Sequence, residues 1–329
     1  MAFTATSLRQ LSKPLILDGG LGSELELLHP PAMHHKLWSG LTLILQPEII
    51  TRIHYSYIAA GSDIVTTSSY QALELGLLEH GADFGIDTPQ KCAVIFDKSI
   101  ACAVAAVDQW VGENPDTPRM RPLVAAAIGP YGAYLANGAE YTGDYGSVTA
   151  AELKRFHALR LVTFLNNRDV DLLAFETFPN VVEFKVCMEL LEEMTQALGV
   201  SKPFYVSFNY RSPTQICDGT PIAEVVSYLA KKPLVSLIAI GGNCVSLAMV
   251  PALLQSLKGL VGGTLPLLVY PNSGEIYDGT TKEWHENDDK DCKFTKEGLN
   301  AWYDAGVRLV GGCCRTGPKD IRLMRESFE

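Results

Sequence analysis

The sequence has few basic residues, and they do not cluster. Its 329 residues include 27 Lys and Arg against 37 Asp and Glu, a formal net charge of −10. Proteins that bind phosphate backbones usually carry basic runs or patches, and none is present here. An acidic surface also repels nucleic acids and anionic lipids. We therefore expect neither nucleic acid nor a membrane as a partner, and a cationic small molecule suits this charge better.

Long apolar runs are also missing. Residues 1–12 lack the apolar core of a signal peptide, and no stretch is long and apolar enough to cross a bilayer. We expect a cytoplasmic protein, in which the 8 cysteines are core residues, metal ligands or reactive thiols rather than disulfides. Cys92, Cys102 and Cys187 lie in helical patterns among aliphatic residues, which predicts that they are buried.

Short apolar runs recur along the chain, each nearly continuous in hydrophobicity. Parallel strands have this pattern when helices cover both faces of their sheet. The eight runs are residues 14–17, 63–67, 123–128, 171–175, 204–208, 236–240, 267–270 and 308–310. Eight strands separated by helical segments predict an α/β fold, a single (β/α)8 TIM barrel domain over residues 1–329. A doubly wound open sheet is the alternative.

Helix signals separate these runs. Pro47 begins a helix that Gly61 ends. Further starts are indicated at Thr88 with Pro89, Thr149 with Glu152, Asn180 with Glu183, Thr220 with Pro221, and Gly317 with Pro318. Two segments that follow strands are expected to be long loops: residues 129–147, rich in Gly and Tyr, and residues 273–293, rich in charge. Loops at this end of the strands build the active site of a barrel.

Three cysteines follow strands directly. Cys244 comes after two glycines and an asparagine, and Cys313 and Cys314 come after Gly311 and Gly312. The carboxyl ends of barrel strands share one mouth, so the three thiolates could converge on a zinc ion with an open fourth position. An incidental, structural or redox-active pair remains the alternative. A zinc ion with three thiolate ligands can bind a substrate thiol at its open position and keep it deprotonated and nucleophilic. This chemistry predicts the transfer of an alkyl group to sulfur.

Two acidic residues end strands of the predicted barrel. Asp18 ends the first and Glu176 the fourth, and either could bind a substrate ammonium or steer a cationic donor. A turn or cap role is the alternative for Asp18. The amides of Gly19 and Gly20 could bind a substrate carboxylate. Tyrosines of the segment 129–147 could cover a sulfonium by cation–π contact or simply pack. They are Tyr131, Tyr134, Tyr141 and Tyr145.

On both cysteine segments, and on Asp18-Gly19-Gly20 and Glu176-Thr177, the chain resembles the homocysteine S-methyltransferases. The resemblance implies that Cys244, Cys313 and Cys314 bind one zinc ion per chain, and that Asp18 and Glu176 help to bind homocysteine. Residues 66–71, 129–133, 140–141 and 270–275 are similar to the branch that uses a sulfonium donor. The donor implied is S-methylmethionine or S-adenosylmethionine, and the product is methionine.

Three other functions remain open at this stage. The acceptor could be selenocysteine or another small thiol. The chain could be a non-enzymatic redox-sensing thiol protein that uses Cys313 and Cys314. It could also be a barrel lyase or isomerase acting on a phosphorylated substrate. The only candidate phosphate-binding glycines after the last two strands are Gly311 and Gly312, and they lead straight into cysteines. The sequence gives no indication of oligomeric state.

Overall fold

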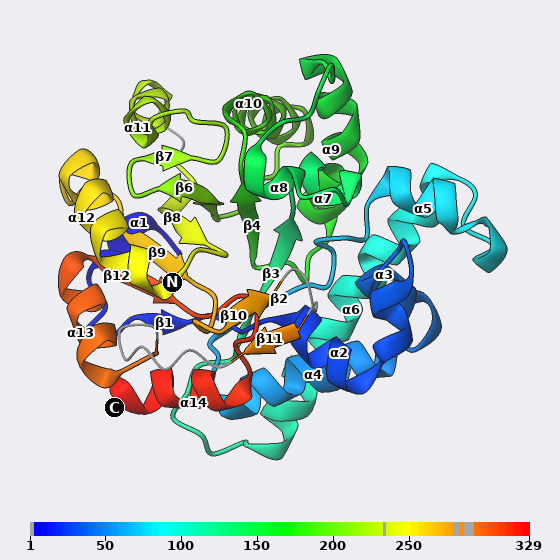
Figure 1. Ribbon diagram of the computed structural model, residues 1–329. Coiled ribbons are helices and arrows are strands. Elements are labelled where there is room, and N and C mark those ends of the chain that lie inside the picture. The colour runs from blue at the N-terminus through cyan, green and yellow to red at the C-terminus, as the bar shows by residue number, and fades with distance from the viewer. Residues whose placement is uncertain (1–2, 233–234, 279–282, 286–292) are drawn as a thin grey trace.

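Eight parallel strands form the centre of the computed structural model (Figure 1). The structure describes residues 3–232, 235–278, 283–285 and 293–329. The strands are β1 (Leu15–Ile16), β2 (Ile64–Thr66), β3 (Leu123–Ile128), β4 (Leu172–Phe178), β5 (Phe204–Phe208), β8 (Leu237–Asn243), β9 (Leu267–Tyr270) and β12 (Val307–Val310). Their order, β1-β12-β9-β8-β5-β4-β3-β2, places each strand beside its neighbours in the chain.

Hydrogen bonds close the ring between β1 and β2. The Asp63 N–H donates to the Ile16 carbonyl at 2.7 Å, and the Asp63 carboxylate accepts from the Ile16 N–H at 2.9 Å. One turn further along, the Asp18 carboxylate accepts from the Thr66 N–H at 2.7 Å. These bonds join the two strands that would be the edges of an open sheet. The predicted barrel is confirmed, and the open doubly wound sheet is excluded.

Helices surround the barrel (Figure 1). The longer ones are α4 (Pro47–Ala60), α6 (Pro89–Glu113), α9 (Ala150–Asn166), α10 (Val181–Leu198), α11 (Ile222–Lys231), α12 (Val250–Val261), α13 (Lys296–Ala305) and α14 (Pro318–Ser327). Shorter ones are α1 (Ala5–Arg9), α2 (Leu21–Leu28), α3 (Ser39–Leu45) and α5 (Glu74–His80). The predicted caps at Thr88 and Thr149 form, and Gly61 ends α4. No helix among the described residues is long and apolar enough to span a membrane.

Alternate strand residues belong to two separate buried clusters. In β4, Leu172 and Ala174 pack in one cluster, whereas Leu173 and Phe175 pack in the other. Successive strand side chains point to opposite faces, so the first cluster fills the barrel and the second lies beneath the helices. This double burial explains why the strands read as continuous apolar runs rather than as alternating ones.

Two strands extend further than the sequence suggests. β4 continues to Phe178, so Glu176 lies within the strand rather than ending it. β8 continues through Gly241 to Asn243, which pairs with Tyr270 of β9. A Cβ added at Gly241 would lie 1.7 Å from the Leu268 carbonyl oxygen. The glycines that suggested a turn therefore allow a close approach of two strands.

The two predicted loops contain regular structure. Residues 129–147 include two short helices, α7 (Tyr131–Leu135) and α8 (Ala139–Thr142). Residues 273–293 include an antiparallel pair, β10 (Ile276–Asp278) and β11 (Glu283–His285). The rest of that segment, residues 279–282 and 286–292, lies outside the described residues. Both predicted long loops therefore contain short regular elements where they are described.

Candidate active site

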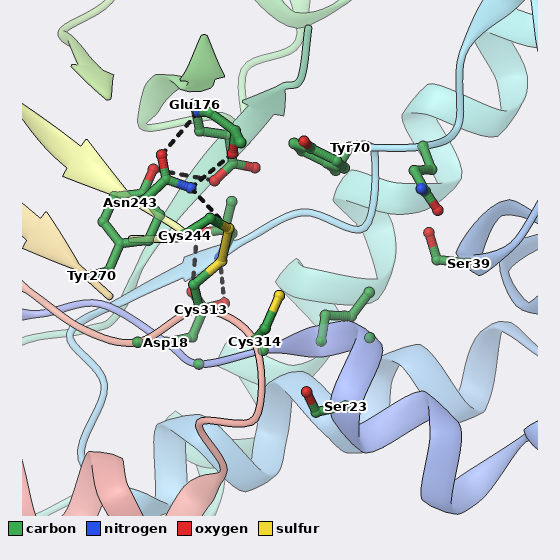
Figure 2. Close-up of a pocket in the computed structure, with 18 of the residues that line it drawn as sticks. Asp18, Ser23, Ser39, Tyr70, Glu176, Asn243, Cys244, Tyr270, Cys313 and Cys314 are labelled. Carbon is green, nitrogen blue, oxygen red and sulfur yellow. Dashed lines mark hydrogen bonds between the residues drawn. A yellow bond between two sulfur atoms is a disulfide. The ribbon is translucent and has the colours of Figure 1, made fainter. Parts of the chain in front are cut away.

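A cavity of about 480 Å³ opens at the carboxyl ends of the barrel strands (Figure 2). Its volume lies in the range of small-molecule sites. All seven residues singled out from the sequence line it: Asp18, Gly19, Gly20, Glu176, Cys244, Cys313 and Cys314. Glu176 lies in β4, and the others lie in the segments that follow β1, β8 and β12, so the barrel brings together residues from nearly the whole length of the chain.

The three cysteines form one cluster. Their sulfur atoms all lie within 4.8 Å of one another. The structure records a disulfide between Cys244 and Cys313, whose Cα atoms are 5.4 Å apart, and Cys314 is free (Figure 2). Tetrahedral zinc with Zn–S bonds of about 2.3 Å holds its sulfur ligands about 3.8 Å apart. The reduced cluster therefore fits a zinc ion. In the disulfide, two of the three sulfur atoms are bonded to each other and cannot bind zinc as thiolates.

Hydrogen bonds between loops hold the cysteine backbone. The Cys313 N–H donates to the Pro271 carbonyl at 2.8 Å, and the Cys314 N–H donates to Asn272 Oδ1 at 3.2 Å. The Gly312 N–H donates to the Asp18 carbonyl at 3.1 Å. The segment after β12 is thus fixed to those after β9 and β1, which positions two of the three thiols.

Strained backbone is concentrated at this cavity. Five non-glycine residues of the described chain have positive φ, and four of them line the cavity: Trp38 (50°), Thr177 (61°), Cys244 (52°) and Arg315 (62°). Only special local structure maintains such conformations in residues other than glycine. Two of the four lie at or next to cysteines of the cluster.

Asn243 connects β4 to the cysteine cluster. Its Oδ1 accepts from the Thr177 N–H at 2.9 Å and from Ser207 Oγ at 2.6 Å, while its Nδ2 donates to Thr177 Oγ1 at 2.7 Å. The same Nδ2 lies 3.5 Å from Cys244 Sγ (Figure 2). Sequence reasoning assigned this residue no role. The sequence does hold a signal for this residue: an amide side chain follows a strand predicted to be buried. A buried amide needs hydrogen-bond partners, so such a residue is expected to hold neighbouring segments in place.

Two buried carboxylates face the cavity beside the cysteines. Asp18, 8% exposed, accepts from the Thr66 N–H and from Thr66 Oγ1, and burial raises its pKa to about 7. Glu176, also 8% exposed, accepts from the Tyr270 hydroxyl at 3.2 Å. Burial, with a contribution from the Asp18 charge, raises the pKa of Glu176 to about 8. Because burial disfavours their charged forms, both would gain from a bound cation.

The two glycines after β1 have a steric role. A Cβ at Gly19 would lie 2.4 Å from the Thr316 carbonyl oxygen, and one at Gly20 would lie 2.5 Å from the Cys313 carbonyl oxygen. The Gly20 N–H donates to the Thr316 carbonyl at 2.9 Å, so this amide is already bonded within the protein. A role of the Gly19 and Gly20 amides in binding a substrate carboxylate stays a prediction. Leu21, at the start of α2, also lines the cavity, and first-turn amides have no partner within their helix.

Most tyrosines of the segment 129–147 pack away from the cavity. Tyr131 contacts Tyr134, Tyr145 and Phe156, with ring centroids 5.1 to 5.5 Å apart. Tyr141 is the one of the four predicted tyrosines that lines the cavity. Packing, rather than cover for a ligand, is therefore the role of the other three. Tyr70 also lines the cavity (Figure 2), although sequence reasoning gave it no such role.

Fold and site together define a (β/α)8 barrel enzyme with a cysteine cluster and buried carboxylates at the mouth of the barrel. The family model described as homocysteine S-methyltransferase matches residues 15–328, and the chain belongs to this family. This membership confirms the family, the fold and the enzyme class predicted from the sequence.

Relatives with the same family name match nearly the full length of the chain. The chain is 41% identical over 311 residues to the homocysteine S-methyltransferase of Escherichia coli, covering 94% of each. It is 38% identical over 322 residues to homocysteine S-methyltransferase 1 of Arabidopsis thaliana, covering 95% of this chain and 93% of the relative. The metallated form of the homocysteine methyltransferase MmuM from E. coli superposes with a TM-score of 0.80 at 36% identity, covering 98% of each chain. The oxidized form of MmuM gives the same TM-score over 97% of each chain.

Proposed function

We propose that this chain, acting as one domain over residues 1–329, transfers a methyl group from S-methylmethionine to the thiol of homocysteine. A bond forms between the methyl carbon and the homocysteine sulfur, and the bond from that carbon to the sulfonium sulfur breaks. Its electron pair stays on the departing sulfide, so two molecules of methionine result and the thiol proton is released. The observation that carries the proposal is the cluster of three cysteine sulfurs within 4.8 Å, placed at the barrel mouth.

Cys244, Cys313 and Cys314 would hold one zinc ion through their thiolates. When bound, zinc lowers the pKa of a substrate thiol while its sulfur ligands keep the bound sulfur nucleophilic. Asn243 Nδ2 lies 3.5 Å from Cys244 Sγ and orients that ligand. The disulfide between Cys244 and Cys313 is the oxidised state of the same cluster, and zinc requires its reduction.

The carboxylates and the start of α2 suit the amino-acid end of homocysteine. Asp18 and Glu176 would pair with the ammonium group, whose positive charge offsets the cost of burying them as anions. The first-turn amides of α2, at Leu21 and Gly22, would bind the carboxylate, because the N-terminus of a helix favours an anion. With both ends held, the thiol would be directed to the cysteine cluster.

Metal analysis tests the proposal directly. The protein is purified reduced and without oxygen, beside Cys244→Ser and a control, Cys92→Ala, which removes a buried thiol of α6 outside the cluster. We expect about one zinc ion per chain in the wild type and the control, as three thiolates with an open position imply. Cys244→Ser is expected to lose both zinc and methionine formation from homocysteine and S-methylmethionine.

Other outcomes would replace the proposal. A folded, fully reduced wild type that stays inactive after zinc is added would overturn it and favour the redox-sensing alternative. Competition between homocysteine and selenocysteine tests the acceptor, since preference for selenocysteine would change the substrate while keeping the site. S-adenosylmethionine assayed in parallel tests the donor. The cytoplasmic location stays a prediction.

A further inference from the structure

We propose that Glu140 binds the positive charge of the methyl donor, separately from the carboxylates that would bind homocysteine. The inference rests on the proposed function, because it assigns one end of the same cavity to a cationic donor. It gives the site two acidic regions with different tasks: Asp18 and Glu176 for the acceptor, and Glu140 for the donor.

The backbone around Glu140 is firmly held. Glu140 lies in α8, which is bounded by two glycines with left-handed φ, Gly138 (84°) and Gly143 (71°). Asn209 Nδ2 donates to the Glu140 carbonyl at 3.1 Å. Gly132 of α7 lies so close that a Cβ there would be 2.7 Å from the Glu140 nitrogen. The side chain therefore reaches the cavity from a fixed backbone rather than from a loose loop.

The Glu140 carboxylate has an unmet hydrogen-bonding need. Its Oε2 is shielded from solvent and accepts no hydrogen bond from any described residue. Burial raises the pKa of this carboxyl. Asp18 and Glu176 differ, because each accepts hydrogen bonds from the protein. A shielded carboxylate oxygen without a donor is costly unless a ligand supplies one.

A second residue that lines this cavity, Ser68, also holds a buried polar atom without a partner among the described residues. Ser68 is 2% exposed, and its Oγ has no hydrogen-bond partner among the described residues. It lines the cavity from the segment after β2, whereas Glu140 lines it from α8. Two elements far apart in the chain thus each supply a cavity-lining residue with a buried polar atom that has no partner among the described residues. A polar ligand, rather than local packing, accounts for both.

Charge interactions place Glu140 close to Cys314 and to two tyrosines that line the cavity. Its negative charge helps to raise the pKa values of Cys314, Tyr70 and Tyr141. The Glu176 carboxyl is influenced by Asp18 rather than by Glu140. Glu140 therefore lies near Cys314, Tyr70 and Tyr141, and the Glu176 charge also contributes to the raised pKa of Tyr70. Tyrosine rings beside a carboxylate suit a cation such as a sulfonium or an ammonium.

The test compares Glu140→Gln with Glu26→Gln, using the whole reduced, zinc-loaded enzyme. Glu26 is another cavity-lining carboxylate, but its side chain is half exposed and already paired with Arg315 at 3.3 Å. We expect Glu140→Gln to raise the KM for S-methylmethionine by about 10- to 100-fold, the size of a lost charge-assisted hydrogen bond. The KM for homocysteine and the thermal midpoint should stay near wild type, and Glu26→Gln should change neither KM. Glu140→Asp should restore part of the donor affinity.

Dimethylsulfoniopropionate identifies which donor charge is bound, since it keeps the sulfonium and lacks the ammonium. It is assayed as a donor, or as a competitive inhibitor if it is not turned over. If Glu140→Gln binds both S-methylmethionine and dimethylsulfoniopropionate more weakly than the wild type, Glu140 contacts the sulfonium. If it binds only S-methylmethionine more weakly, Glu140 contacts the ammonium. An unchanged KM for S-methylmethionine, or a raised KM for homocysteine instead, would overturn the inference.

The failure of this inference can be told apart from failure of the proposed function. If the wild type forms methionine and Glu140→Gln behaves like it, only the role of Glu140 is wrong. If the wild type forms no methionine, calorimetric titration of the reduced protein with S-methylmethionine still decides the inference. Binding that is weaker in Glu140→Gln than in Glu26→Gln supports it, and equal binding or none contradicts it.

Discussion

The side chain of Asn243 forms two hydrogen bonds with Thr177, one from each end of its amide group. Oδ1 accepts from the Thr177 N–H at 2.9 Å, and Nδ2 donates to Thr177 Oγ1 at 2.7 Å. Thr177 has a φ of 61°, and it directly follows Glu176. Because Nδ2 also lies 3.5 Å from Cys244 Sγ, one amide orients both the proposed substrate strand and a proposed metal ligand.

Asn243→Ala should weaken metal binding. We expect a loss of about 10- to 100-fold in zinc affinity, as for other groups that orient metal ligands, with a parallel fall in kcat/KM. Zinc affinity is measured by competition with a chelator under reducing conditions. The control is Ser207→Ala, which removes the 2.6 Å bond to Asn243 Oδ1 but leaves the group facing Cys244. Equal zinc affinity in wild type and Asn243→Ala would contradict this role.

Homocysteine binding should strengthen as pH rises from 6 to 8. The pKa of Asp18 is raised to about 7 by burial, so without substrate this carboxyl is largely protonated at pH 6 and cannot pair with an ammonium. The KM for homocysteine should therefore fall across this range. Asp18→Asn should show a higher KM for homocysteine that changes less with pH. The substrate thiol titrates in both proteins, so the difference between the wild-type and Asp18→Asn pH profiles isolates the contribution of the carboxylate. Identical pH profiles of KM in the wild type and Asp18→Asn would show that Asp18 does not bind homocysteine.

His54 should make the protein sensitive to acid. It is fully buried in α4, neither ring nitrogen has a partner among the described residues, and burial lowers its pKa to about 4. The unfolded chain takes up this proton below about pH 6.5 and the folded one only near pH 4, so the free energy of unfolding falls as pH falls between them. The loss approaches about 3 kcal/mol.

Denaturant unfolding at pH 7.5 and pH 5 measures the effect of His54. His54→Leu should reduce the difference between the two pH values, because the titrating group is gone. His80→Ala provides the control, since His80 is partly exposed beside Glu79. A pH difference that is the same in wild type and His54→Leu would show that other groups cause the acid sensitivity.

Gly20→Ala should destabilise the protein and loosen the cysteine segment. The new Cβ would meet the Cys313 carbonyl oxygen at 2.5 Å, so the two segments must separate. We expect a loss of roughly 1–3 kcal/mol in the free energy of unfolding, typical of overpacking. Gly259→Ala is the control, because nothing lies within 4 Å and it is inside helix α12. That change should be neutral or stabilising by up to about 1 kcal/mol. Gly20→Ala with wild-type stability would contradict the tight contact.

Glu183→Ala should cost far more than the removal of a surface glutamate on the same helix. The Glu183 side chain is fully buried and accepts from His157 Nε2 at 2.8 Å and from the Tyr145 hydroxyl at 2.6 Å. We expect a loss of about 3–5 kcal/mol, because buried partners are left unpaired. Glu193→Ala breaks the exposed pair with Lys154 and should cost less than about 1 kcal/mol. Equal thermal unfolding of the two variants would count against the buried network.

The barrel could be predicted because burial on both faces leaves continuous apolar runs, which local periodicity detects. The cysteine cluster could be predicted because strand ends in a barrel share one mouth. The end of β8 could not be predicted, because Gly241 suggests a turn in the sequence. Its close contact with Leu268, which explains why a glycine is needed there, is visible only in the structure. That contact joins segments far apart in the sequence, so no local pattern records it.

The hydrogen-bond partners of polar side chains could not be predicted from local sequence either. Asn180 caps α10 as predicted, but Glu183 does not complete a capping box and instead binds His157. Spacing identifies a glutamate near a helix start, whereas its partner comes from another helix. The Gly20 amide is likewise bonded to Thr316, near the other end of the chain. Local sequence therefore predicted which residues reach the cavity better than it predicted what each of them contacts.

The four strained residues of the cavity, Trp38, Thr177, Cys244 and Arg315, have a consequence for protein engineering. Each positive φ opposes folding by about 1–3 kcal/mol, and glycine would relax it. A screen that selects only for heat resistance would therefore enrich glycine at these positions and erode the cavity. Selection for thermostability and selection for turnover should diverge at these four positions first, since stabilising changes often carry a functional cost.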